Sequence, residues 1–263
     1  MPKLTTPDRV NLNYTDIGSG RPIVMIHGWP LSGAAFADNA KVLAAAGYRV
    51  ITYDRRGFGQ SGKPRDGYDY DTLAADLDAL LTGLDLHDVV LLGFSMGGGE
   101  VARYLATRGS ERVGAAILSG SICPALCITK DNPDGAMPRE GFQELADACA
   151  ADHAGFVDQF CGWFYSNDQG LTVPEEVRQQ AVEIARQSAP HAAVATILTW
   201  TEDLREDCRR IDVPLLVIHG DGDQNVPLAK SSARMPEYAQ QAQLVVIEGG
   251  PHGINVSHAD QWN

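Results

Sequence analysis

The chain has 263 residues, enough for one large α/β domain with a sizeable core, or for such a domain with an insertion. Hydrophobic residues make up 44% and charged residues 21% of the chain, which excludes an intrinsically disordered or fibrous protein. The net charge of −13 comes without any basic cluster, which argues against a nucleic-acid partner, and no apolar run is long enough to cross a membrane.

Apolar runs alternate along the chain with segments of helical periodicity. Residues 10–14 alternate strictly between apolar and polar side chains, which predicts a half-buried edge strand. Five later runs are apolar on both faces, as is typical of buried parallel strands: Ile23–Ile26, Val89–Leu92, Ala115–Leu118, Leu215–Ile218 and Leu244–Ile247. Apolar residues recur at helical spacing over 36–44 and 73–84, the second stretch behind a predicted cap at Asp71. This order predicts a doubly wound, mostly parallel α/β sheet covered by helices.

The alternation breaks after Ser119. From 121 to about 200 no buried strand is predicted, and the loop signals Cys123-Pro124 and Asn132-Pro133-Asp134-Gly135 precede several helical stretches. We therefore expect an α/β core of residues 1–120 and 201–263 and a helical cap insertion of residues 121–200. Seven aromatic residues could line an apolar pocket or form the cap's own core: Phe142, Phe156, Phe160, Trp163, Phe164, Tyr165 and Trp200.

The five cysteines are Cys123, Cys127, Cys149, Cys161 and Cys208. Their number is odd and no two have the two-residue spacing of a zinc site, so neither a disulfide framework nor a metal centre is predicted. Residues 1–20 lack the basic start and apolar core of a secretory signal. Together these features favour a cytoplasmic protein.

A nucleophile is predicted in Gly93-Phe94-Ser95-Met96-Gly97, which follows one of the buried strands and leads into a helical segment through Arg108. At such a strand-to-helix turn a serine is held in a strained conformation, and glycines on either side leave room for neighbouring backbone. The hydroxyl of Ser95 is then presented to a substrate.

A serine hydroxyl needs a base that takes its proton and a carboxylate that orients the base. Functional residues of an open parallel sheet gather at the carboxyl ends of strands, which leaves His27, His219 and His252 as candidates. His252 follows the last strand through a flexible turn, whereas His27 and His219 end their own strands, where a structural role is commoner. The carboxylate is Asp221 or Asp223, and the residues alone do not choose between them.

Two backbone N–H groups must stabilise the oxyanion that forms when a serine attacks a carbonyl. Met96 supplies one, because its N–H is free at the start of the predicted helix. Trp29 is the expected second donor, from the loop His27-Gly28-Trp29-Pro30. Pro30 has no N–H to give, and it restricts Trp29 to an extended conformation.

Six motifs together resemble those of the α/β-hydrolase superfamily and, within it, the cofactor-free haloperoxidase, perhydrolase and arylesterase family, which also includes γ-lactamases. Between about Asn11 and His258 they are His27-Gly28-Trp29-Pro30, Tyr53-Asp54-Arg55-Arg56-Gly57-Phe58-Gly59-Gln60-Ser61, Gly93-Phe94-Ser95-Met96-Gly97-Gly98-Gly99-Glu100, Asp131-Asn132-Pro133-Asp134-Gly135, His219-Gly220-Asp221-Gly222-Asp223-Gln224-Asn225-Val226-Pro227 and Gly250-Pro251-His252-Gly253. The resemblance implies the catalytic residues Ser95, Asp223 and His252 and the oxyanion donors Trp29 and Met96. It also implies that the charges of the second motif brace the nucleophile turn.

The resemblance implies a serine hydrolase of the carboxylesterase or arylesterase type, which cleaves a small ester, lactone or amide through an acyl-enzyme without cofactor or metal. If hydrogen peroxide replaces water and a short carboxylic acid is the acyl donor, the product is a peracid that oxidises halide. Pro30 is similar to the proline of members named for perhydrolysis, so this side activity is expected. The alternatives are perhydrolysis (non-haem chloroperoxidase) as the main role, a γ-lactamase, or a non-enzymatic binding protein on the same fold.

Members of this family often form trimers or larger assemblies, so a homo-oligomer is expected. Ser257 is predicted to cap a final helix, and the chain given stops at Asn263, whereas relatives continue through a full helix that covers the sheet. Without that helix, apolar sheet surface is expected to be exposed.

Overall fold

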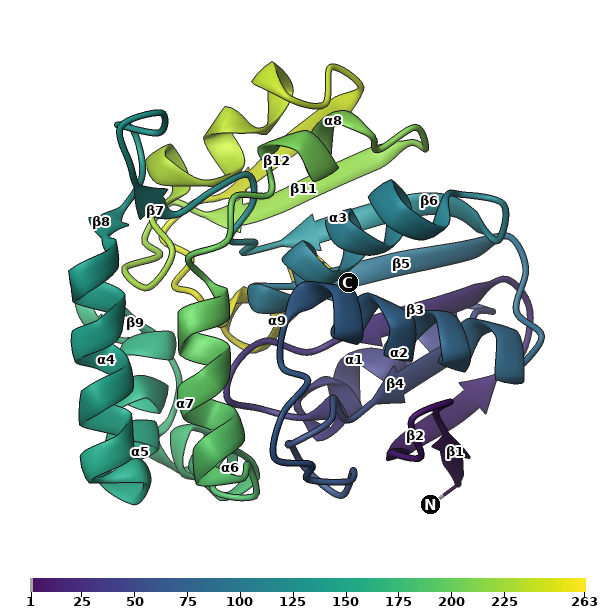
Figure 1. Ribbon diagram of the computed structural model, residues 1–263, viewed down its shortest axis with the longest axis horizontal. Coiled ribbons are helices and arrows are strands. Elements are labelled where there is room, and N and C mark those ends of the chain that lie inside the picture. Colours follow the sequence, from purple (N-terminus) through teal and green to yellow (C-terminus); the bar gives the residue numbers. More distant parts are fainter. Residues whose placement is uncertain (1) are drawn as a thin grey trace.

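The computed structural model describes residues 2–263, and its main feature is an eight-stranded sheet in the order β1-β2-β4-β3-β5-β6-β11-β12 (Figure 1). β2 pairs antiparallel with β1 and β4, and every other pair in this sheet is parallel. The strands are β1 (Lys3–Thr5), β2 (Asn11–Gly18), β3 (Pro22–Ile26), β4 (Arg49–Tyr53), β5 (Val89–Phe94), β6 (Val113–Ser119), β11 (Leu215–Gly220) and β12 (Ala242–Ile247). This mixed, mostly parallel sheet confirms the predicted fold class.

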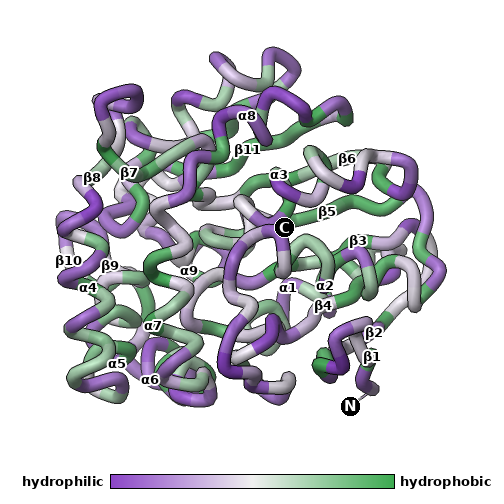
Figure 2. The backbone as a smooth tube through the Cα atoms, in the orientation of Figure 1, coloured by the Kyte–Doolittle hydropathy of each residue, from purple (hydrophilic) through white to green (hydrophobic). Residues whose placement is uncertain are grey.

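Helices pack along the sheet so that its central strands are buried. α3 packs against β5 and β6, α2 packs against α3, and α1 packs against β2 and β4. The helices are α1 (Ala37–Ala45), α2 (Tyr70–Gly83), α3 (Met96–Arg108), α4 (Arg139–Ala151), α5 (His153–Phe164), α6 (Glu175–Ala185), α7 (Pro190–Thr199), α8 (Arg205–Arg209), α9 (Ile254–Ser257) and α10 (Ala259–Trp262), with 3-10 turns η1 (Gly33–Phe36), η2 (Leu228–Lys230) and η3 (Ser232–Glu237). Figure 2 shows hydrophobic residues concentrated along β5 and β11.

α4, α5, α6 and α7 gather at one end of the sheet, on the left of Figure 1. The carboxyl ends of the parallel strands point toward this group. All four helices fall within 121–200, but this stretch also holds two-residue strands, β7 (Cys127–Ile128), β8 (Met137–Pro138), β9 (Ser166–Asn167) and β10 (Gly170–Leu171), which pair only among themselves. The division of the chain into a core and a cap stays a prediction.

Four strands of the eight-stranded sheet differ from the sequence expectation, and the first of them, β1, was not predicted. β4 was not predicted, because only Val50 and Ile51 are adjacent aliphatic residues between Arg49 and Thr52. β2 is not an edge strand, since β1 pairs on its outer side. β12 is an edge strand rather than a buried one, and Val245 and Val246 are 48% and 45% exposed.

Two predicted caps are wrong by a few residues. α2 is capped by Asp69, whose side chain accepts the Thr72 N–H at 2.8 Å, while Asp71 lies in the first turn. Ser257 ends α9, and its hydroxyl donates to the Gly253 carbonyl instead of capping a following helix. The five cysteines are buried free thiols. None of the helices formed by residues 2–263 has both the length and the apolar character that crossing a bilayer requires.

Candidate active site

Ser95 lies at the sharp turn between β5 and α3. Its backbone has φ 55° and ψ −119°, a region that residues other than glycine rarely occupy. A Cβ atom added to Gly93 would lie 2.4 Å from the Gly97 carbonyl oxygen, and one added to Gly97 would lie 2.5 Å from the Ile26 carbonyl oxygen. The turn therefore requires glycine on both sides of the serine, as the motif predicts.

Ser95, His252 and Asp223 meet at the carboxyl ends of the strands, although they are far apart in the sequence. His252 Nε2 lies 2.9 Å from Ser95 Oγ, and His252 Nδ1 lies 2.6 Å from Asp223 Oδ2. The three residues are 6%, 1% and 5% exposed, in the order Ser95, His252, Asp223. Because the carboxylate accepts the Nδ1 proton, Nε2 is left to accept the serine hydroxyl proton.

The structure separates the two candidate carboxylates. Asp221 is exposed, and its Oδ1 accepts the Gly249 N–H at 2.6 Å. Asp223 is buried and faces His252. The residue favoured by the family resemblance is thus the one whose carboxylate reaches the imidazole.

The carboxylate of Asp223 accepts hydrogen bonds from two directions. Oδ1 accepts the backbone N–H groups of Asn225 at 2.9 Å and Val226 at 2.8 Å. Oδ2 faces both His252 and the Nε2 atom of His219, which is 3.0 Å away. Burial by itself raises the pKa of Asp223, but the charge of His252 and the hydrogen bond from His219 outweigh burial, so the pKa lies well below its ordinary value.

His219 is a residue whose part in the site the sequence did not reveal. It ends β11 and is buried, as a structural histidine would be. Its Nδ1 accepts the Ser232 hydroxyl at 2.7 Å, and its Nε2 donates both to the Val226 carbonyl at 2.8 Å and toward Asp223. Only the fold brings it to the carboxylate, since the motif spacing does not tell which way the ring points.

His27, the third candidate base, serves the backbone instead. Its Nε2 accepts the Arg55 N–H at 3.0 Å, and its Nδ1 donates to the Gly28 carbonyl at 2.8 Å. Burial, followed by the charge of Arg55, lowers the pKa of His27 well below its ordinary value. Both ring nitrogens of His27 are thus paired with backbone groups rather than with Ser95.

Trp29 lies in the loop after β3, and Met96, which follows Ser95 in the chain, is the first residue of α3. A Cβ atom on Gly28 would lie 3.0 Å from the Ser95 Cβ, so the loop after β3 runs directly against Ser95. The Trp29 indole donates to the Ala193 carbonyl at 3.0 Å, which fixes the ring between the sheet and α7. Within residues 2–263 the backbone N–H groups of Trp29 and Met96 donate to no protein acceptor. The Met96 group also lies at the positive end of α3.

A cavity of about 290 Å³ opens beside Ser95 and His252. Five of the seven aromatic residues noted in the sequence line it: Phe142, Phe156, Phe160, Trp163 and Trp200. The other two are packing residues, with Phe164 in edge contact with the His252 ring at 4.9 Å and Tyr165 in contact with Phe164. The remaining lining residues are Ile122, Leu126, Ala136, Met137, Leu145, Gln224, Asn225 and Val226.

The charged side chains of the Asp54–Ser61 loop pair with other groups of the protein. The Arg55 guanidinium donates to Glu100 Oε2 at 2.9 Å and to the His27 carbonyl at 2.8 Å. Asp54 accepts the Gly33 N–H at 2.9 Å. Burial raises the pKa of Glu100, and the charge of Arg55 opposes that rise. The loop thus braces the strand ends and contributes no group to the cavity lining.

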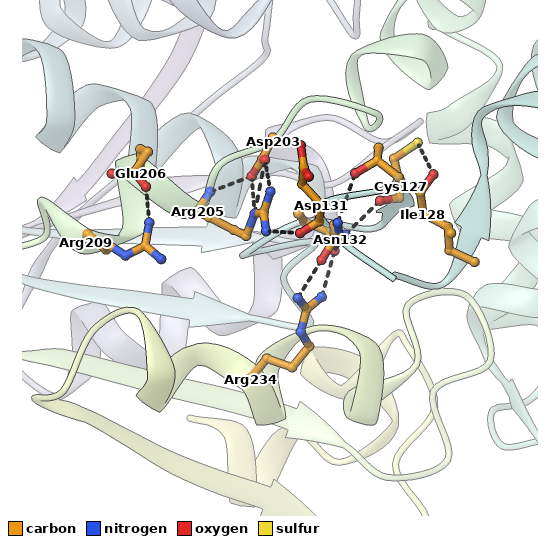
Figure 3. A network of polar contacts seen from close by, with 11 residues as sticks. Cys127, Ile128, Asp131, Asn132, Asp203, Arg205, Glu206, Arg209 and Arg234 are labelled. Carbon is orange, nitrogen blue, oxygen red and sulfur yellow. Dashed lines mark hydrogen bonds and ion pairs between the residues drawn. The ribbon is translucent and has the colours of Figure 1, made fainter. Parts of the chain in front are cut away.

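A second polar network, shown in Figure 3, holds the loop that carries Leu126 and Met137 to the cavity. The Asn132 amide donates to the Cys127 carbonyl at 2.7 Å and accepts from Arg234 at 2.6 Å. Arg234 also donates to the Ala125 carbonyl at 3.1 Å. The sequence predicts a turn in this loop, but it does not show that a buried arginine from η3 holds the loop in place.

The family of the chain follows from comparison with known proteins. The protein-family model described as alpha/beta hydrolase fold matches residues 21–259 of this chain. The chain belongs to the α/β-hydrolase family. A provisionally named non-heme chloroperoxidase of Synechocystis sp. is 46% identical over 97% of this chain and 92% of its own length.

Two further relatives extend this similarity. A protein of Acinetobacter calcoaceticus named as a bifunctional esterase/perhydrolase is 33% identical over 99% of this chain and 95% of its own length. The crystal structure of a bromoperoxidase from Bacillus anthracis is 39% identical and superimposes with a TM-score of 0.96, covering 100% of this chain and 96% of that chain. The resemblance to haloperoxidases and perhydrolases expected from the motifs is therefore confirmed.

Proposed function

We propose that this protein is a serine-dependent acyl-transfer enzyme whose main role is perhydrolysis, with hydrolysis of small esters, lactones or amides on the same acyl-enzyme. The proposal rests on one observation, the chain of contacts from Asp223 through His252 to Ser95 at 2.6 and 2.9 Å. This reverses the order expected from the sequence, in which hydrolysis came first. The names of the relatives, among them a chloroperoxidase and a bromoperoxidase, favour the reversal.

In the first half of the reaction Ser95 Oγ attacks the carbonyl carbon of a small ester or acid while its proton passes to His252 Nε2. Asp223 stabilises the imidazolium that forms. The negative charge on the carbonyl oxygen is held by the N–H groups of Trp29 and Met96. The bond to the leaving oxygen then breaks as His252 returns the proton to it, and an acyl-Ser95 ester remains.

In the second half a molecule of hydrogen peroxide gives a proton to His252 and attacks the acyl carbon. Ser95 leaves with that proton, and the product is a peracid. The peracid, one halide ion and one proton give the carboxylic acid and hypohalous acid, so the halide is oxidised and the peracid reduced. Water in place of peroxide gives the carboxylic acid directly, which is ester hydrolysis.

The chemistry of the cavity supports small uncharged acyl groups. Its lining within the described chain contains no Lys, Arg, Asp or Glu side chain. A volume of about 290 Å³ is at the small end of ligand cavities. Small esters, lactones or amides, hydrogen peroxide and short carboxylic acids are therefore the proposed partners, while a cytoplasmic location and a homo-oligomer stay predictions.

The test uses Ser95→Ala beside Ser110→Ala, a serine at the far end of α3. Hydrolysis of p-nitrophenyl acetate and halogenation with acetate, bromide and peroxide are both measured. Ser95→Ala should lower both rates by about 10³-fold or more, whereas Ser110→Ala should change neither. Halogenation that survives in Ser95→Ala would contradict a shared acyl-enzyme. Peracid formation that never exceeds hydrolysis at saturating peroxide would leave the enzyme an ester hydrolase.

A further inference from the structure

Two residues that line the cavity beside Ser95 carry three buried polar side-chain atoms that the protein leaves without a partner. They are Nε1 of Trp200 and both Nδ2 and Oδ1 of Asn225, which form no hydrogen bond with any atom of residues 2–263. Both residues line the cavity. A buried polar atom without a partner destabilises a folded protein by about 1–3 kcal/mol, so such atoms are uncommon and point to a ligand.

Both residues are held in place by contacts that do not use these atoms. The backbone N–H of Asn225 donates to Asp223 Oδ1 at 2.9 Å, which fixes the residue beside the carboxylate. Trp200 follows α7, is 9% exposed, and its ring packs edge-on against Trp29 with centroids 5.3 Å apart. Asn225 therefore approaches the cavity from the loop after β11, and Trp200 approaches it from the helical group.

The atoms define what a partner must offer. An indole Nε1–H can only donate a hydrogen bond, while a primary amide donates two and accepts through its oxygen. A group with both an acceptor and a donor satisfies them, as an amide or a hydroxyl does. The group must be neutral, because no charged side chain of the described residues lines the cavity and an unpaired buried charge is strongly unfavourable.

We propose that Asn225 and Trp200 select acyl groups that carry a neutral amide or hydroxyl beyond the reacting carbonyl. This inference rests on the proposed acyl-transfer function and deepens it. An acyl group of the same length without a polar group leaves the three atoms unpaired, and a site that hydrogen-bonds a substrate discriminates strongly against such an analogue. The apolar lining binds the carbon chain, and the two polar residues set which chain is preferred.

The test compares p-nitrophenyl N-acetyl-β-alaninate with p-nitrophenyl hexanoate, whose acyl chains have the same length. We expect the wild-type kcat/KM to be about tenfold or more higher for the amide-containing ester. Asn225→Leu should remove most of that preference by lowering kcat/KM for the amide ester much more than for the hexanoate. Trp200→Phe, which keeps an aromatic ring and removes only the N–H donor, should reduce the preference by a smaller factor. Gln143→Leu, on the exposed face of α4, is the matched control and should keep the wild-type ratio.

The possible results separate this inference from the proposed function. Equal kcat/KM for the two esters, with Ser95 still labelled by a fluorophosphonate, would overturn the inference and leave acyl transfer intact. The inference is also overturned if Asn225→Leu and Trp200→Phe each lower kcat/KM for the two esters equally. It is likewise overturned if Asn225→Leu changes only the KM for hydrogen peroxide. No cleavage of either ester and no labelling of Ser95 would overturn both.

Discussion

The two walls of the cavity differ in how completely their polar atoms are paired. On the wall built by the strand ends, every oxygen of the Asp223 carboxylate and both ring nitrogens of His252 have protein partners. Asn225, in the loop after β11, and Trp200, after α7, also line the cavity and are together called the unpaired wall here, because three of their buried polar atoms have no partner within residues 2–263. The groups that we propose to react are thus fixed before a substrate arrives, which is what electrostatic preorganisation requires. The unpaired wall is where a substrate can still add hydrogen bonds, so changes on the two walls should affect different kinetic quantities.

The largest effect should come from the paired wall. Asp223→Asn keeps the shape of the side chain but favours the wrong imidazole tautomer, so we expect kcat to fall by about 10⁴-fold for every ester. The matched control is Asp221→Asn, which makes the same chemical change two residues away and keeps the oxygen that accepts the Gly249 N–H. Steady-state kinetics on p-nitrophenyl acetate measure both. A loss in Asp221→Asn as large as that in Asp223→Asn would contradict the assignment of the acid.

The nucleophile turn should be the next most sensitive feature. In Gly97→Ala the added Cβ would lie 2.5 Å from the Ile26 carbonyl oxygen, and backbone on both sides must move. We expect the free energy of unfolding to fall by about 3 kcal/mol. Gly162→Ala in α5 is the control, because nothing lies within 4 Å of its added Cβ. That variant should gain up to about 1 kcal/mol in urea denaturation, and equal losses in the two variants would refute a packing requirement at 97.

The strand ends of the paired wall were largely predictable from the sequence, because local patterns mark them. The buried runs before Ser95 and before the Asp221 and Asp223 pair are continuous and apolar, and the glycines beside Ser95 are required by a local turn. β4 was missed because its apolar run is only two residues long, and the pattern of β12 did not reveal that no strand pairs on its outer side.

Side-chain partners could not be predicted in the same way. The contact of His219 with Asp223 depends on the rotation of a ring at the end of β11, and the sequence only shows that both residues follow one strand. Likewise, the lack of a partner for the Asn225 amide depends on the packing around that side chain, which the sequence does not show. Features fixed by periodicity were found, as was the set Ser95, Asp223 and His252 that the family motifs implied, whereas the other tertiary contacts were not.

The pH dependence of the free energy of unfolding should include a contribution from His27, which follows β3 and makes no contact with Ser95, His252 or Asp223 among the hydrogen bonds described above. Its pKa lies well below 6.5 in the folded protein, so below that pH the unfolded chain binds a proton that the native state does not. Stability from this residue is therefore complete above pH 6.5 and falls as the pH drops, by about 2 kcal/mol between pH 6.5 and 5.

His27→Gln isolates this contribution. The variant should be less stable at pH 7, because a neutral imidazole that pairs with Arg55 and Gly28 is lost. However, its free energy of unfolding should decline less steeply between pH 6.5 and 5 than that of the wild type. Urea denaturation across this range measures the two slopes. Parallel curves would mean that His27 is protonated in the native state or that another residue carries the effect.

The smallest effect should come from His219, a positioning residue that acts through Asp223. His219→Phe keeps a ring but removes the N–H that faces Oδ2. Without that hydrogen bond, the negative charge of the carboxylate stabilises the His252 imidazolium more strongly. We expect the acidic limb of kcat/KM to move up by about 0.5 pH unit and kcat/KM at pH 8 to fall about fivefold or less. His219→Gln, which can still donate a hydrogen bond, should restore part of the shift.

This pH shift distinguishes an electrostatic role from a merely structural one. Loss of the His219 ring also leaves the Ser232 hydroxyl and the Val226 carbonyl without their partner, which destabilises the loop after β11. Ser232→Ala removes one of those contacts and leaves the N–H toward Asp223 in place, so it should lower stability without moving the acidic limb. If Ser232→Ala and His219→Phe shift the limb equally, packing accounts for both results, and the second imidazole does not tune the carboxylate.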